Sequence, residues 1–226
     1  MASLSNMDLE PLPVGLVHGL GRGSPSMMLL AHRLLAARFS VFLVEYPSTT
    51  GTLSELRHIV GEQVQEAVGD ARCDLVGHSL GGIVSLQLKV GLLSRQVRRV
   101  VQMGSPNLGS PLADVARKIP GVAEVFGPTL DALAERDIDL LHLPDDERML
   151  LGAIAGTGGW RTVTQFYGLE DANDGKVSVE SALGAGPGNA VLVETSHTML
   201  PVSSVVGAHV KSFLRQGYFD GIGEDA

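Results

Sequence analysis

Cysteine is almost absent from this 226-residue chain: Cys73 is the only one, which excludes an internal disulfide. It stands in the apolar run "CDLVGH", so we expect a small buried side chain and not a reactive thiol. No stretch reaches the roughly 18 consecutive apolar residues that a membrane-spanning helix needs. The opening "MASLSNMDLE" has neither the basic region nor the apolar core of a secretion signal, so a cytoplasmic location is the expectation.

Basic residues are also scarce, since 17 Lys and Arg face 25 Asp and Glu and give a net charge of −8. This balance argues against nucleic acids and anionic membrane surfaces as partners. Hydrophobic residues make up 44% of the chain and charged residues 19%, which is typical of a globular protein. With no linker or repeat, residues 1–226 are expected to form one domain.

Short apolar runs alternate with helical patterns, and this alternation predicts an α/β fold: a mainly parallel sheet with helices on both faces. One helix is expected to begin with Ser24 as N-cap and Pro25 in its first turn, and another at the capping box "TLSE" (52–55). The predicted strands are 13–19, 41–47, 73–77, 97–106, 149–157, 162–168 and 189–197. Functional residues of such sheets follow the carboxyl ends of the strands.

Segment 107–148 breaks this alternation. It is interrupted by prolines and has two short helical patterns, 112–118 and 122–136. It is expected to form a small helical cap or lid-like insertion, and a rigid cover that only completes the core is an equal alternative. A final helix is predicted at 203–217.

The stretch Gly77-His78-Ser79-Leu80-Gly81 lies between a predicted strand and a predicted helix. It fits the G-x-S-x-G pattern, in which a sharp turn presents a nucleophilic serine. The flanking glycines are expected because a Cβ would collide across so tight a turn. The following helix points its N-terminus, with free N–H groups, toward the serine. Ser79 is therefore the predicted nucleophile.

A serine needs a general base, and His197 is the predicted one because it directly follows the last strand. His18 and His78 lie before or beside the serine, and strand alternation is expected to turn His78 away from it. His142 lies in the irregular segment. The remaining histidines, His32, His58 and His209, lie within helical patterns.

The acid that orients this base is expected between the nucleophile and the histidine. Glu170, Asp171 and Asp174 are available there, and Asp174 is favoured because Asn-Asp-Gly makes a tight turn that can aim the carboxylate. Backbone N–H groups of Leu80 and of Leu20, in the loop "HGLGRGSPS", are the predicted oxyanion donors, with Gly21 as a near alternative. His18 is expected to hold this loop in place.

Five ordered segments, "LVHGLGRG", "VGHSLGG", "MGSPNLGS", "NDGKVSVESA" and "SHTML", resemble the α/β-hydrolase superfamily and, within it, bacterial lipase and esterase-like proteins. The resemblance implies a compact α/β-hydrolase fold, with Ser79, Asp174 and His197 as the triad. It also implies hydrolysis of a small-molecule carboxylic ester with a short or medium acyl chain, through an acyl-enzyme, without cofactor or metal. A thioesterase, an amidase, or a catalytically silent binding protein of the same fold are the alternatives.

Overall fold

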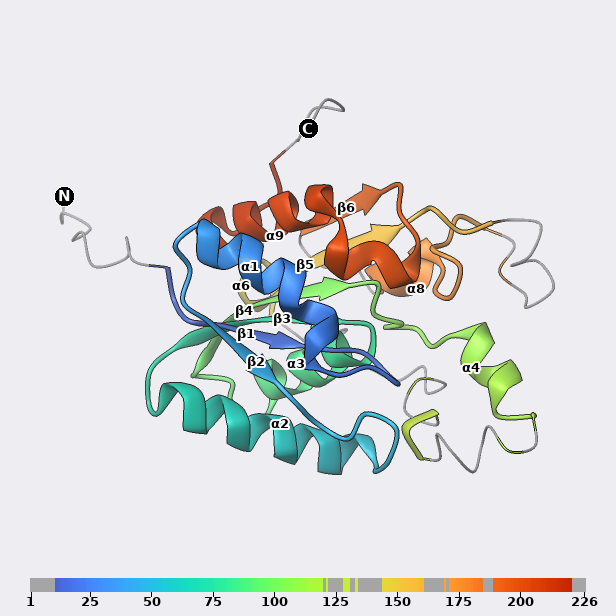
Figure 1. Cartoon of the computed structure of the whole chain (residues 1–226), viewed down its shortest axis with the longest axis horizontal. Coiled ribbons are helices and arrows are strands. Elements are labelled where there is room, and N and C mark those ends of the chain that lie inside the picture. The colour runs from blue at the N-terminus through green and yellow to red at the C-terminus, as the bar shows by residue number, and fades with distance from the viewer. Residues whose placement is uncertain are drawn as a thin grey trace.

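The computed structural model describes residues 11–119, 121, 128–130, 133, 144–160, 169, 171–184 and 189–220. Six strands form one parallel sheet in the order β2-β1-β3-β4-β5-β6 (Figure 1). They are β1 (Val14–Val17), β2 (Val41–Val44), β3 (Cys73–His78), β4 (Val97–Met103), β5 (Leu151–Gly156) and β6 (Asn189–Val193). The predicted parallel α/β sheet is therefore confirmed, while the run at 162–168 lies outside the described residues.

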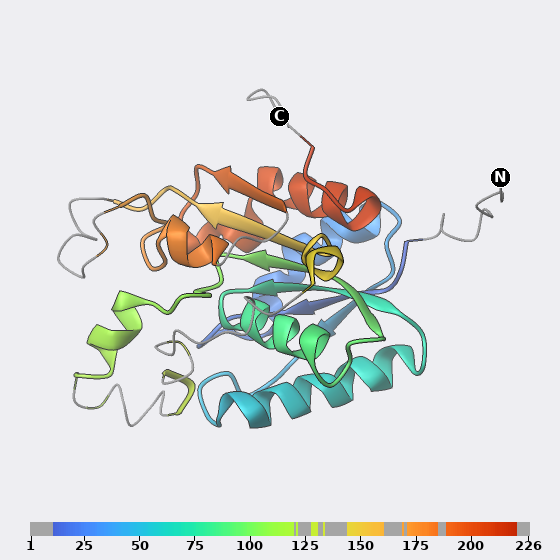
Figure 2. The same ribbon diagram turned by 180° about the vertical axis from the view of Figure 1, so that it is seen from behind.

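Helices cover both faces of the sheet, as Figures 1 and 2 show. The covering helices are α1 (Met28–Ala36), α2 (Leu53–Val68), α3 (Leu80–Val90) and α9 (Ser204–Gln216). Strand alternation sends neighbouring side chains into different layers: Leu75 joins the buried cluster under α2 and α3, whereas Val76 joins the one under α1 and α9. Cys73 is buried in β3, and burial raises the pKa of its thiol to about 12.

Of the two predicted helix N-caps, the structure confirms the one at Thr52 and not the one at Ser24. At α2 the capping box forms: the Glu55 amide donates to the Thr52 hydroxyl, and the Glu55 carboxylate accepts from the Thr52 amide at 2.7 Å. Ser24 does not cap its helix. It is the first residue of the 3-10 turn η2 (Ser24–Met27), whose N-cap is Gly23, and its amide donates to the Glu45 carboxylate at 2.7 Å.

Part of segment 107–148 is described. It contains α4 (Pro111–Ala116) and α6 (Asp145–Arg148), and the buried Lys89 of α3 pairs with Glu147 of α6 at 2.5 Å. The pattern at 122–136 falls mostly outside the described residues. Toward the C-terminus lie α8 (Val179–Leu183) and the 3-10 turn η5 (His197–Val202). No helix in the described ranges is long and apolar enough to cross a membrane.

The strand order places a crevice beside β1. The chain passes from β1 outward to β2 and then crosses to β3 on the other side, so the loops after β1 and β3 diverge at the carboxyl edge. Glycines allow α3 to pack closely against β1 and allow the tight turn between β3 and α3. A Cβ on Gly81 would lie 2.3 Å from the Val17 carbonyl oxygen, and one on Gly77 would lie 2.3 Å from the Gly82 nitrogen.

We expect Gly81→Ala to lower the free energy of unfolding by about 3 kcal/mol or more, because backbone atoms cannot move aside as a flexible side chain would. Gly207→Ala is the matched control, also within a helix. There the new methyl group meets only the flexible Arg33 and Leu30 side chains, and we expect a change within about 1 kcal/mol. Urea unfolding of both variants measures the difference. Equal midpoints would contradict the close packing.

Candidate active site

Ser79 occupies a strained turn between β3 and α3. Its φ of 54° and ψ of −121° lie in a region that side chains rarely adopt, at a cost of about 1–3 kcal/mol. Its amide donates to the Met103 carbonyl of β4 at 2.9 Å, which holds the turn against the neighbouring strand. Helix α3 starts at Leu80, directly after the serine. The G-x-S-x-G stretch thus has the strand-turn-helix setting that was predicted.

Asp174 and His197 form a buried pair at the same edge of the sheet. Nδ1 of His197 lies 2.7 Å from Oδ2 of Asp174, and the His197 amide donates to the Asp174 carbonyl at 2.8 Å. Since a carboxylate accepts, Nδ1 carries the proton and Nε2 keeps its lone pair when the ring is neutral. The side chains are 7% and 1% exposed, so water does not compete for this bond.

The loop that carries Asp174 is shaped by its own side chains. The Asn173 side-chain oxygen accepts from the Gly175 amide at 2.9 Å, and Gly175 has a φ of +100°, which favours glycine. Oδ1 of Asp174 accepts from the amides of Lys176 at 3.0 Å and Val177 at 2.8 Å. Of the other candidate acids, Asp171 is exposed and Glu170 lies outside the described residues.

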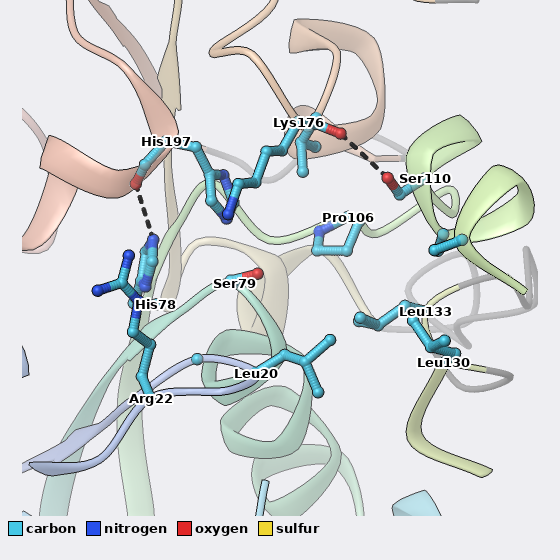
Figure 3. Close-up of a pocket in the computed structure, with 14 residues that line it drawn as sticks. Leu20, Arg22, His78, Ser79, Pro106, Ser110, Leu130, Leu133, Lys176 and His197 are labelled. Atoms are coloured by element: carbon cyan, nitrogen blue, oxygen red, sulfur yellow. Dashed lines mark hydrogen bonds between the residues drawn. The ribbon is translucent and has the colours of Figure 1, made fainter. Parts of the chain in front are cut away.

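Ser79 and His197 line one pocket (Figure 3). In this view the Ser79 hydroxyl points into the pocket and the His197 ring lies above it. No hydrogen bond links these two described side chains. Rotation of the serine side chain between staggered rotamers changes the direction of its hydroxyl, and such bonds often tighten only when substrate binds.

The loop after β1 lies directly against the serine. A Cβ on Gly19 would lie 3.2 Å from the Ser79 Cβ. The Gly21 amide donates to the Ser48 hydroxyl at 3.1 Å, so it is already engaged. The Leu20 and Leu80 amides donate to no acceptor in the described ranges, and both residues are close to the serine.

His18 supports this loop. Its ring stacks on Tyr46 with centroids 4.4 Å apart, and the Tyr46 hydroxyl donates to the His18 carbonyl at 2.7 Å. Nε2 of His18 also lies 3.3 Å from the Glu45 carboxylate. Burial raises the pKa of the Tyr46 phenol, so this group remains a donor. The prediction that His18 has a structural role at the loop agrees with these contacts.

His78 has a place in the pocket that the sequence did not predict. It lines the pocket, and its Nε2–H donates to the His197 carbonyl at 2.9 Å. It was expected to turn away from Ser79, and no hydrogen bond between these two described side chains is found, but its ring lines the pocket and lies 4.8 Å from the His197 ring, centroid to centroid. Burial, with repulsion from His197, holds the pKa of His78 well below its ordinary 6.5. The position of this histidine directly before Ser79 was the available sequence signal.

The remaining wall of the pocket has an apolar side and a polar rim. Its apolar side is formed by Pro106, Ala113, Ala116, Leu130 and Leu133, and its polar rim includes Arg22 and Lys176. The other histidines stay away from it. His32 and His58 are exposed, His209 packs edge-on against Phe219, and His142 lies outside the described residues. Among the described residues no cluster of acidic, histidine or cysteine side chains could hold a metal ion.

A parallel sheet that presents a serine on a tight turn, beside an Asp–His pair at the same edge, is the architecture of an α/β hydrolase. The family comparison agrees, because the model of the alpha/beta hydrolase family matches residues 16–210. The chain belongs to this family, as the resemblance of its motifs predicted. No curated protein sequence matches the chain.

Solved structures share the fold at low identity. Lipase BlEst2 from Bacillus licheniformis, in its mature form, is 19% identical with a TM-score of 0.72, and the match covers 92% of each chain. The metagenomic carboxyl esterase MGS0156 is 20% identical with a TM-score of 0.64, covering 85% of this chain and 66% of that one. Carboxylesterase CesB from Bacillus subtilis is 15% identical with a TM-score of 0.57, covering 91% and 84%. The TM-scores show a common fold despite the low sequence identities.

The buried, neutral His78 predicts a pH dependence of stability. Its pKa is lower in the folded than in the unfolded chain, so below about pH 6.5 the unfolded chain binds a proton that the folded chain refuses. Stability is then lost as the pH falls. We expect wild type to lose about 1 kcal/mol more than His78→Phe between pH 6.5 and 5.5, measured by urea unfolding.

His32→Phe is the control, because His32 is exposed on α1. This variant should keep the wild-type pH dependence. If His78→Phe also kept it, His78 would be taking up a proton in the folded state.

Proposed function

We propose that the protein is a serine hydrolase that cleaves carboxylic esters through an acyl-enzyme. The observation that carries this proposal is the 2.7 Å contact between Asp174 and His197 in the pocket that also holds Ser79. It fixes the tautomer in which Nε2 of the neutral ring can accept a proton. Similarity to structures described as a lipase and carboxylesterases supports ester substrates.

In the proposed reaction His197 takes the proton from Ser79 as the hydroxyl attacks the ester carbonyl. Asp174 holds the ring and stabilises its protonated form. His197 then gives the proton to the leaving alcohol, which departs and leaves the acyl group on Ser79. Water, activated by the same imidazole, releases the acid and restores the serine. Besides the ester and one water molecule, these steps use only Ser79, His197 and Asp174.

The negative charge on the attacked carbonyl oxygen needs donors that are in place beforehand. We assign this role to the Leu20 and Leu80 amides. The engagement of Gly21 by Ser48 favours Leu20 over its neighbour. The Leu80 amide lies at the N-terminus of α3, where the helix dipole also favours a negative charge.

The apolar side of the pocket is suited to a short or medium acyl chain. It is formed in part by Ala113 and Ala116 of α4 and by Leu130 and Leu133, all from segment 107–148. The Ser110 amide also donates to the Leu133 carbonyl at 3.0 Å, and the Ser110 hydroxyl donates to the Lys176 carbonyl at 3.0 Å. We therefore propose that this segment is a cap on a single hydrolase domain.

Ser79→Ala should lower hydrolysis of p-nitrophenyl butyrate by about 10⁴-fold or more, because the members of a triad act as a unit. A fluorophosphonate probe should label wild type and fail to label this variant. Ser94→Ala, at an exposed serine, is the control and should keep both properties. Wild-type turnover by Ser79→Ala would refute the assignment, and an unlabelled wild type would indicate a silent binding protein.

Asp174→Asn should lower kcat by about 10⁴-fold with little change in KM, because an amide no longer selects the required tautomer of His197. Asp171→Asn is the matched control, since Asp171 is exposed in the same loop. Steady-state kinetics of both variants, with circular dichroism as a check on folding, distinguish their roles. An equal effect of the two substitutions would argue against Asp174 as the orienting acid.

A further inference from the structure

Two cationic side chains, Arg22 and Lys176, lie on the rim of the pocket. Both residues are exposed, and neither side chain forms an ion pair or hydrogen bond in the described part of the chain. They stand out in a protein whose net charge is −8. Arg22 belongs to the loop after β1, and Lys176 belongs to the loop that carries Asp174. Two separate loops thus bring free positive charge to one place.

The two cations lie on the histidine side of the pocket. In Figure 3 the Lys176 side chain extends toward His197 and the Arg22 guanidinium lies beside His78, while Leu130 and Leu133 lie across the pocket. Burial is the main cause of the lowered pKa of His78, and repulsion from Lys176 and Arg22 adds to it, in line with their position on the histidine side of the pocket (Figure 3).

The nearby carboxylates are already engaged. Asp174 accepts from His197 and from two backbone amides. Glu45 accepts from the Ser24 amide at 2.7 Å and lies 3.3 Å from the His18 ring. An anion that enters the pocket would therefore meet two cations that have no other described partner.

The proposed reaction indicates which half of an ester would lie beside the two cations. Because His197 must hand a proton to the leaving oxygen, the alcohol part of an ester lies on the imidazole side, and the acyl chain lies toward the apolar wall. We propose that the preferred substrates are esters whose alcohol part carries an anionic group, a carboxylate or a phosphate, bound by Arg22 and Lys176. This inference rests on the proposed ester hydrolysis.

The test compares esters with one acyl group and different alcohols: phenyl butyrate, 4-(butanoyloxy)benzoate and 4-(butanoyloxy)phenyl phosphate. The measured quantity is kcat/KM of each anionic ester divided by that of the neutral ester. In Arg22→Met and in Lys176→Met this ratio should fall about five- to tenfold, and further in the double variant. The larger fall among the two anionic esters identifies the preferred anion. Added salt should lower the ratio in wild type but not in the double variant.

The double variant Arg72→Met/Arg95→Met is the matched control. It removes the same net charge from exposed residues that precede β3 and β4, at the opposite edge of the sheet. Its ratios should equal those of wild type. A second control is mono(p-nitrophenyl) glutarate, an ester that carries its carboxylate on the acyl part. Its kcat/KM divided by that of p-nitrophenyl butyrate should fall less in Arg22→Met and Lys176→Met than the ratios above.

A binding measurement separates this inference from the proposed function. Ser79→Ala should bind 4-(butanoyloxy)benzoate about tenfold more tightly than phenyl butyrate in calorimetry, and adding Arg22→Met and Lys176→Met should remove the difference. If wild type hydrolyses the esters but the cation variants keep its ratios and binding, the substrate preference is refuted and ester hydrolysis stands. If wild type hydrolyses none of them, the proposed function fails, and with it this inference.

Discussion

The contact between Asp174 and His197 is the constraint on which the rest of the site depends. It has two parts, a side-chain hydrogen bond of 2.7 Å and a backbone hydrogen bond of 2.8 Å, so the loop before α8 and the start of η5 are held in one orientation. A carboxylate this deeply buried is costly unless its oxygens are satisfied. Two backbone amides bind its other oxygen. The imidazole is thereby aimed before any substrate arrives.

A second constraint acts on the backbone around Ser79. The serine has a strained conformation, and the glycines near it allow the loop after β1, the turn and α3 to approach within distances that a Cβ would prevent. The strain and the close packing both result from the tight turn that carries Ser79. They place the serine at the switch between β1 and β3, where the loops diverge and the pocket lies.

The distribution of charge in the pocket differs from that of the whole chain. A net charge of −8 describes long-range repulsion and solubility, whereas a substrate responds to the groups within a few ångströms. There the rim is cationic and the opposite wall is apolar. His197 and Ser79 line the same pocket, between the cationic rim and the apolar wall (Figure 3).

The amino-acid sequence by itself determined the six strands of the described sheet, the order of the site segments along the chain and the position of Ser79 between a strand and a helix. These depend on short-range patterns: apolar runs, the Thr52 capping box, and glycines around a turn. A seventh predicted strand, 162–168, lies outside the described residues. Only the tertiary structure decided that His78 supports His197, that Ser48 engages the Gly21 amide, and that Arg22 and Lys176 share a rim. The first of these contacts joins residues 119 positions apart. No local sequence pattern predicts a contact between residues so far apart in the chain, because the contact depends on how the loops meet after the sheet has formed.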